Sequence, residues 1–84
     1  MLRITDSAAE RLKAALQQQP EENACFRIGV TAEHARMAID QPRAGDSTVA
    51  HEGEVLVVMD AVTSEYLEGR TLDYDEAAAR LVLT

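Results

Sequence analysis

The sequence predicts a small α+β domain that is rich in strands and carries one amphipathic helix near its N-terminus. Apolar residues recur at helical spacing over 8–16. Apolar and polar residues alternate over 24–30 and again over 35–39, which is typical of half-buried strands. Residues 54–59 are almost continuously apolar, as in a strand that is buried on both faces.

Chain length limits the protein to one domain, which we take to span residues 1–84. A chain of this size buries only about 60–65% of the surface that its unfolded form exposes, so the margin of stability is thin. Aromatic residues make up 4% of the chain and there is no Trp. The predicted core is therefore aliphatic.

The first predicted elements are a short strand over 1–4 and the amphipathic helix. Three successive residues suit the N-cap: Thr5, Asp6 and Ser7. Of these, Ser7 forms an S-x-x-E capping box with Glu10. The apolar stripe then consists of Ala8, Leu12, Ala15 and Leu16. The helix should end before Pro20, because the residue that precedes a proline resists helical geometry.

Two strands over 24–30 and 35–39 predict a hairpin. In the first, Phe26 and Ile28 lie on one face and Cys25 lies on the other. The favoured interpretation is that Cys25 is a small structural residue on this second face, and the alternative is a thiol that solvent can reach. A turn is expected over 42–46, where proline and glycine occur close together.

The second half of the chain predicts a short strand over 47–51, a tight turn at Glu52–Gly53 and the buried strand over 54–59. A short helix over 61–67, capped by Gly69, and an extended segment over 70–74 follow. Residues 75–80 contain good helix formers, so helix and turn both remain open there. Residues 81–84 favour a strand.

Charge and cysteine content exclude several classes of protein. Eight Lys and Arg against fifteen Asp and Glu give a net charge of −7. This balance argues against duplex DNA or an anionic membrane as a partner, because phosphate binding needs clustered cations. The single cysteine excludes an intrachain disulfide framework. The longest strictly apolar run, 55–59, is too short to span a membrane, and no signal peptide is recognisable. A cytoplasmic location is expected.

Three segments resemble the HesB-like A-type carriers of iron–sulfur cluster biogenesis, the group that includes IscA. Residues 4–8 resemble the family's I-T-x-x-A start, and residues 26–30, FRIGV, resemble its L-R-I-G-V strand. The most specific match is over 60–74, where D-x-x-T-x-x-Y-L-x-G-x-x-L-D-Y resembles the family's D-x-x-S-x-x-Y-L-x-G-x-x-I-D-Y. The resemblance implies a single HesB-like domain with a small sandwich-like or barrel-like arrangement of sheets.

The sequence departs from the family where the cluster ligands belong. The family has three cysteines, one in a G-G-C-S-G loop after the L-R-I-G-V strand and two in a C-G-C tail. Here the residues after Val30 are Thr31-Ala32-Glu33-His34, with no glycine or cysteine, and residues 77–84 hold no such tail. Cys25 matches no ligand position of the family. The main hypothesis is therefore a non-enzymatic accessory or interaction module that has lost the cluster site and needs no cofactor.

Replacement ligands give an alternative. Cys25 and His34 from two subunits of a homodimer would together supply two thiols and two imidazoles to iron or to an iron–sulfur cluster. His34 lies beside Glu33 in the loop, close to where the family's first cysteine would fall. The simpler interpretations are a solvated loop histidine for His34 and the same for His51, which stands beside Glu52.

Enzymatic activity is not expected. The sequence contains no nucleophile–base–orienter set and no glycine-rich phosphate loop, so a small hydrolase or isomerase that uses His34 and Glu33 rests on residue types alone. The expected partners are proteins: the iron–sulfur assembly machinery, which the resemblance implies, and a second copy of the chain, because the core is thin.

Overall fold

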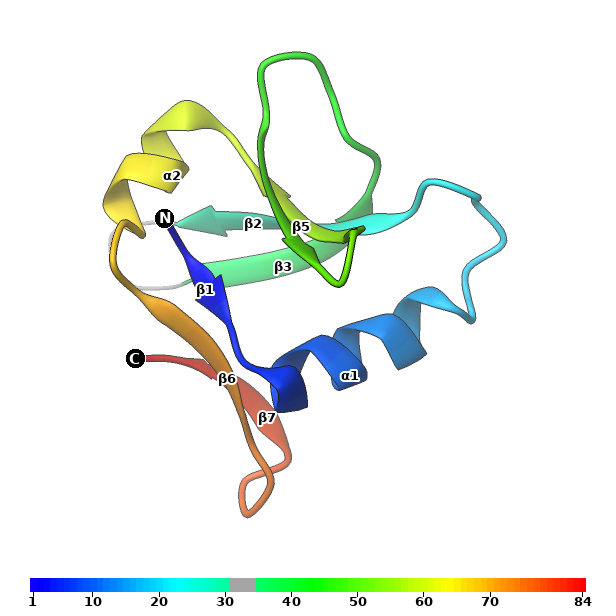
Figure 1. The fold of residues 1–84 in the computed structure, drawn as a ribbon, viewed down its shortest axis with the longest axis vertical. Coiled ribbons are helices and arrows are strands. Elements are labelled where there is room, and N and C mark those ends of the chain that lie inside the picture. Colours follow the sequence, from blue (N-terminus) through cyan, green and yellow to red (C-terminus); the bar gives the residue numbers. More distant parts are fainter. Residues whose placement is uncertain (31–34) are drawn as a thin grey trace.

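A computed structural model describes residues 1–30 and 35–84, and within these residues the chain forms two helices and seven strands (Figure 1). Their order is β1 (Arg3–Ile4), α1 (Asp6–Leu16), β2 (Cys25–Val30), β3 (Ala35–Asp40), β4 (Ser47–His51), β5 (Glu54–Met59), α2 (Ala61–Tyr66), β6 (Thr71–Asp75) and β7 (Arg80–Leu83). The β-rich α+β prediction is confirmed.

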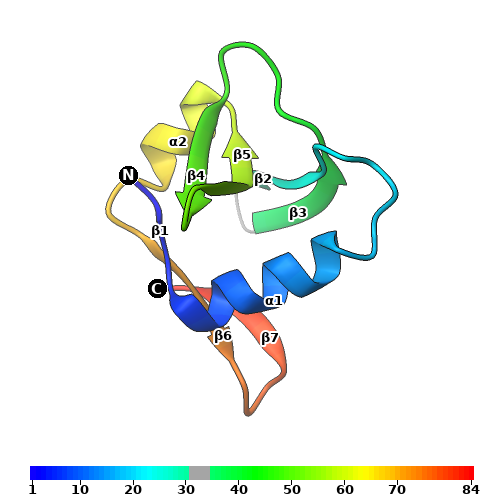
Figure 2. The ribbon, with the colours of Figure 1, turned by 45° about the vertical axis from the view of Figure 1, so that its right-hand side comes forward.

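The strands form two sheets. The larger sheet has the order β3-β2-β5-β4, and the smaller has the order β1-β6-β7. Strand β2 runs antiparallel to β3 and parallel to β5, so the predicted hairpin is the edge of a mixed sheet. The two sheets meet where β1 lies against β4, and α1 runs below the larger sheet and beside β6 (Figures 1 and 2).

Helix α1 begins two residues earlier than a cap at Ser7 would allow. Thr5 is the N-cap, and its Oγ1 accepts a hydrogen bond from the backbone N–H of Ala8 at 3.2 Å. The same hydroxyl donates to Asp73 Oδ1 at 2.8 Å. The capping box of Ser7 with Glu10 is therefore wrong, and both side chains are exposed. The contact with β6 distinguishes Thr5 from its neighbours, and local sequence could not show it.

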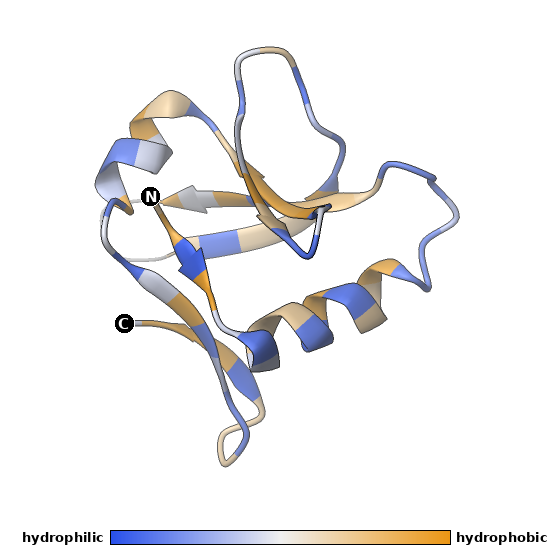
Figure 3. Cartoon of the chain, viewed as in Figure 1, coloured by the Kyte–Doolittle hydropathy of each residue, from blue (hydrophilic) through white to orange (hydrophobic). Residues whose placement is uncertain are grey.

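The core is aliphatic, as predicted, and β5 lies at its centre. Residues 56–59 are at most 1% exposed, because β2 and β4 pair with both edges of β5 and other elements cover both of its faces. Figure 3 shows β5 as a mainly apolar strand, while apolar and polar residues alternate around α1. Burial of β5 on both faces is confirmed.

Two short turns connect neighbouring antiparallel strands, one between β4 and β5 and one between β6 and β7. Glu52 and Gly53 join β4 to β5 with φ of 52° and 82°, so the predicted tight turn is confirmed. Positive φ at both positions suits a two-residue hairpin, because it matches the twist of the strands. Residues 76–79, which were open between helix and turn, form the turn between β6 and β7, where Ala79 has φ of 54°.

Candidate functional site

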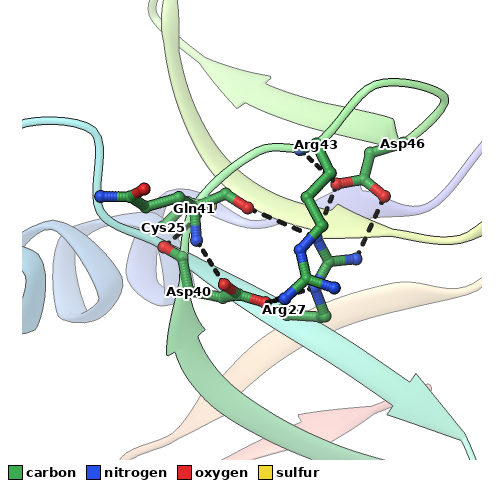
Figure 4. Close-up of polar contacts among 6 residues, drawn as sticks. All are labelled: Cys25, Arg27, Asp40, Gln41, Arg43 and Asp46. Carbon is green, nitrogen blue, oxygen red and sulfur yellow. Dashed lines mark hydrogen bonds and ion pairs between the residues drawn. The ribbon is translucent and has the colours of Figure 1, made fainter.

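Cys25, the only cysteine of the chain, is the first residue of β2 and is buried. It is 1% exposed, and its Sγ donates to the backbone carbonyl of Asp40 at 3.5 Å. It borders a surface hollow of about 400 Å³, between the end of α1 and the start of β2, without opening into solvent there. Cys25 is not reachable from solvent, because its thiol is buried at the start of β2 beside the polar contacts of Arg27, Asp40 and Asp46 (Figure 4).

The environment of Cys25 favours the neutral thiol. Burial raises the pKa of Cys25 above its ordinary value, and the nearby carboxylates of Asp40 and Asp46 raise it further. The charge of Arg27 acts in the opposite direction and is outweighed. The thiolate is the form that binds metals and attacks electrophiles, so the raised pKa and the burial of Cys25 both oppose these reactions.

Arg27 organises the polar cluster next to Cys25 (Figure 4). Its Nε donates to Asp40 Oδ2 at 2.6 Å, and two of its nitrogens form a bidentate pair with Asp46, at 2.6 and 3.1 Å. The backbone N–H of Arg43 also donates to Asp46, and the Arg43 guanidinium lies 3.2 Å from Asp40. The cluster thus ties the loop between β3 and β4 to the outer face of β2.

These ion pairs change the acidity of both aspartates. Hydrogen bonds from Arg27 lower the pKa of Asp40 and of Asp46, and backbone N–H groups lower both further. Both aspartates are therefore ionised at neutral pH. This cluster was not predicted from the sequence, although an arginine on the outer face of a predicted strand and two aspartates around a predicted turn were visible in it.

The two histidines of the chain are His34 and His51, and the structure describes only the second. His34 and Glu33 lie outside the described residues, so the juxtaposition of Cys25 with His34 stays untested. His51, at the end of β4, is not a solvated loop residue, since its side chain is 18% exposed. Its Nε2 lies 2.8 Å from Asp6 Oδ1, and its Nδ1 lies 3.2 Å from Lys13 Nζ. His51 therefore links the β4–β5 hairpin to α1.

The family-like segment over 60–74 supports the scaffold. Asp60 caps α2, and its side chain accepts from the backbone N–H of Thr63 at 2.7 Å. Leu67 and Leu72 are buried, at 1% and 2% exposure. Gly69 has φ of 77°, which only glycine adopts at no steric cost. The most specific motif of the sequence therefore defines a fold and brings no reactive groups together.

The described residues hold no ready metal centre. Among residues 1–30 and 35–84, no three side chains of His, Cys, Asp or Glu come close enough to share a metal ion. Neither helix in the same residues is long and apolar enough to cross a membrane.

Sequence comparison finds relatives among iron–sulfur cluster insertion proteins. The chain is 30% identical to iron-sulfur cluster insertion protein ErpA 2 of Methylococcus capsulatus over 80 residues, covering 89% of this chain and 62% of that protein. It is also 30% identical to ErpA of Salmonella arizonae over 91 residues, covering 99% and 79%. The chain thus spans less than two thirds of the length of the Methylococcus relative. No family model matches it.

Solved structures with the same fold cover nearly the whole chain. A protein from Aquifex aeolicus superposes with a TM-score of 0.73 and 27% identity, over 99% of this chain and 89% of that one. Escherichia coli SufA, which is involved in the biosynthesis of iron–sulfur clusters, gives 0.73 with 18% identity, over 99% and 81%. IscA with a [2Fe-2S] cluster gives 0.66 with 18% identity, over 100% and 84%.

The fold and the sequence relatives together define a class of small iron–sulfur biogenesis proteins. The chain belongs to the HesB-like family of A-type iron–sulfur carriers, as the motifs over 4–8, 26–30 and 60–74 indicated.

Proposed function

We propose that this chain works in iron–sulfur cluster biogenesis as a non-enzymatic accessory or interaction module and that it holds no cluster of its own. The observation that carries the proposal is the state of its only cysteine. Cys25 is 1% exposed, its Sγ donates a hydrogen bond to the Asp40 carbonyl, and the pKa of its thiol is raised. A cluster site needs thiolates that point at a common, accessible space.

Ligand number supports the same conclusion. Iron–sulfur clusters are usually held by four protein ligands, mostly cysteine thiolates. The 84 residues supply one cysteine, and a symmetric dimer would supply two. Both thiols would have to leave their buried positions at the start of β2, and each would have to lose a proton, before they could bind iron.

The family-like scaffold supports a role in protein contacts within the assembly machinery. The residues of the family-like segment cap α2, fill the core and pair β6 with β1, so the chain keeps the fold of a carrier although its single thiol is buried. The one hydroxyl–carboxylate contact named above, from Thr5 to Asp73, belongs to the N-cap of α1, and we assign the chain no reaction.

A cluster-transfer assay tests the accessory role. An A-type carrier loaded with a cluster is mixed anaerobically with an apo-acceptor, with and without a stoichiometric amount of this chain. We expect the rate or the extent of transfer to change when the chain is present. An unrelated acidic protein of similar size and charge is the matched control, and an identical effect of that control, or none from the chain, contradicts the proposal.

Thermal unfolding with ferrous iron tests the alternative, in which Cys25 and His34 bind iron. A ligand that binds only the native state raises its melting temperature. We expect no change with excess ferrous iron under anaerobic conditions. A rise that disappears in both Cys25→Ala and His34→Ala would establish replacement ligands and overturn the proposed function.

A further inference from the structure

Helix α2 lies in the family-like segment, and its outer side carries two large side chains that the fold does not bury. On the inner side, Thr63 is buried, and Leu67 follows the helix into the core. On the outer side, Val62 is 77% exposed and Tyr66 is 62% exposed. Helix α2 lies at the edge of the molecule in both ribbon views (Figures 1 and 2). The tyrosine of the motif is thus on the surface, whereas its neighbours in the motif cap the helix or fill the core.

Val62 and Tyr66 form a pair and are not two scattered residues. They are four positions apart in one helix, so their side chains lie on one face, with about 5–6 Å between the Cβ atoms. Single exposed apolar side chains are ordinary on a protein surface, whereas contiguous ones mark contact sites. Tyrosine is enriched at interfaces, because its ring offers a large apolar surface together with a polar group.

The charged residues of α2 and of its two ends are all negative. Residues 60–69 contain Asp60, Glu65 and Glu68 and neither lysine nor arginine. Glu68 already pairs with the N-terminal amine. Glu65, which directly precedes Tyr66, is exposed and forms no ion pair with any residue of 1–30 or 35–84. Val62, Glu65 and Tyr66 therefore make up an outer face of α2 that offers an aromatic ring, a carboxylate and an apolar side chain.

An arginine side chain suits this combination of groups. A guanidinium can stack on an aromatic ring while its N–H groups bind a carboxylate, whereas the ammonium of lysine lacks the planar surface. The chain itself contains both kinds of contact. Arg11 lies over the ring of Tyr74, 4.4 Å from its centroid. Arg27 forms the bidentate pair with Asp46.

We propose that the outer face of α2 docks a basic amphipathic helix of a partner protein, with an arginine stacked on Tyr66 beside Glu65 and an apolar side chain on Val62. An arginine and an apolar residue four positions apart on the partner helix match the spacing of Tyr66 and Val62. This inference deepens the proposed function and rests on it, because an interaction module needs a surface on which its partner can bind.

Charge favours this partner over two other occupants. A second copy of the chain would bring the acidic face of α2 against itself, and each copy carries a net charge of −7. An anionic membrane would be repelled by the same carboxylates. A cationic helix is attracted both by Glu65 and by the net charge of the chain, and this attraction weakens as salt screens it.

A peptide titration followed in ¹H–¹⁵N NMR spectra tests the docking surface. The probe is a capped, alanine-based helical peptide with leucine and arginine four positions apart. The control peptide has citrulline, which is uncharged, in place of arginine. We expect the arginine peptide to shift the backbone amide signals of residues 60–69 and to bind more weakly as salt rises. The citrulline peptide should bind at least about 2-fold more weakly, because it lacks the cation.

Substitutions of exposed residues test the individual contacts. Tyr66→Ala should raise the dissociation constant of the arginine peptide at least about 3-fold, and Tyr66→Phe, which keeps the ring, should change it by less than about 2-fold. Glu65→Gln should raise it about 2-fold. Glu10→Gln is the matched control, since it removes the same charge from an exposed position on α1 and should leave binding unchanged. An unchanged melting temperature shows that each variant is folded.

Three results overturn the docking surface: no shift at millimolar peptide, shifts that map outside residues 60–69, or equal binding of the citrulline peptide. Shifts of the same signals when the chain alone is concentrated would show a second copy on this face, and would also overturn it. The titration uses no cluster, so its failure is distinguishable from a failure of the transfer assay. If Tyr66→Ala alters cluster transfer as strongly as the unmodified chain does, the proposed function stands and the docking surface is wrong.

Discussion

Two residues on the same face of β2, Cys25 and Arg27, have different environments: the thiol of Cys25 is buried, whereas the guanidinium of Arg27 is partly exposed and forms ion pairs. Cys25 is buried and bonds through its Sγ to the Asp40 carbonyl, whereas Arg27, two residues along on the same face, binds the loop between β3 and β4 through Asp40 and Asp46. The sequence predicted the face on which Cys25 lies. It did not predict the ion pairs of Arg27, because they join residues 13 and 19 positions apart.

Thiol labelling checks the burial of Cys25. We expect the native protein at pH 8 to react with a disulfide reagent at least about 100-fold more slowly than the unfolded chain, because the thiol must be exposed by an opening of the structure. Ser7→Cys, which adds a thiol at an exposed helix position, is the control and should react at once. Equal rates for Cys25 in the native and unfolded chain would contradict the structure.

The N-cap of α1 can be tested by a pair of substitutions. Thr5→Ala removes the acceptor for the Ala8 N–H and the donor to Asp73, so we expect a loss of about 1–2 kcal/mol in the free energy of unfolding. Ser7→Ala should change it by less than about 0.5 kcal/mol, because Ser7 is exposed and does not cap the helix. If urea denaturation gives a larger loss of unfolding free energy for Ser7→Ala than for Thr5→Ala, the capping box of Ser7 with Glu10 is supported instead.

Acid should weaken the fold through Asp40, Asp46 and Asp60. Hydrogen bonds lower the pKa of each carboxyl below its unfolded value, chiefly from Arg27 for the first two and from the Thr63 backbone for the third. Their stabilisation is complete above the unfolded pKa of about 4 and is lost as pH falls through the lower, folded values. We expect the melting temperature to fall below pH 4, and less steeply in Asp46→Asn. Equal slopes for the two proteins would contradict this account.

Among the elements, those with a local periodic signal were predicted and those fixed by distant contacts were not. The stripe of α1, the alternation of β2 and the continuous apolar run of β5 each gave the correct element. Residues 76–79 remained open, because their alanines favour a helix locally, while the pairing of β6 with β7 requires a turn. The N-cap of α1 was predicted wrongly because Thr5 is distinguished from Ser7 by its hydrogen bond to Asp73 of β6, which the local sequence does not show.

Strand β5 should be the most sensitive element of the fold. Leu56→Ala removes a fully buried side chain from its centre, and we expect a loss of about 2–5 kcal/mol in the free energy of unfolding. Val62→Ala in α2 is the control, since Val62 is 77% exposed and should cost less than about 0.5 kcal/mol. Similar losses for both variants would show that β5 is not the centre of the core.

At the scale of the whole molecule, the chain has the fold of the A-type carriers, and its single cysteine is buried at the start of β2. The family motif over 60–74 could be found in the sequence because helix caps, buried leucines and a left-handed glycine leave strict local signatures. Arg27 lies in the motif over 26–30, but its ion-pair partners could not be found from that motif, because Asp40 and Asp46 lie 13 and 19 positions further along the chain.

Anaerobic reconstitution with ferrous iron and sulfide is the most direct test of the central claim, that the scaffold is present without a usable thiolate site. After desalting, iron and acid-labile sulfide are measured per chain, together with the visible absorption of sulfur-to-iron charge transfer. We predict only background amounts, equal in the unmodified chain and in Cys25→Ala. Stoichiometric iron and sulfide in the unmodified chain, lost in Cys25→Ala, would contradict the account.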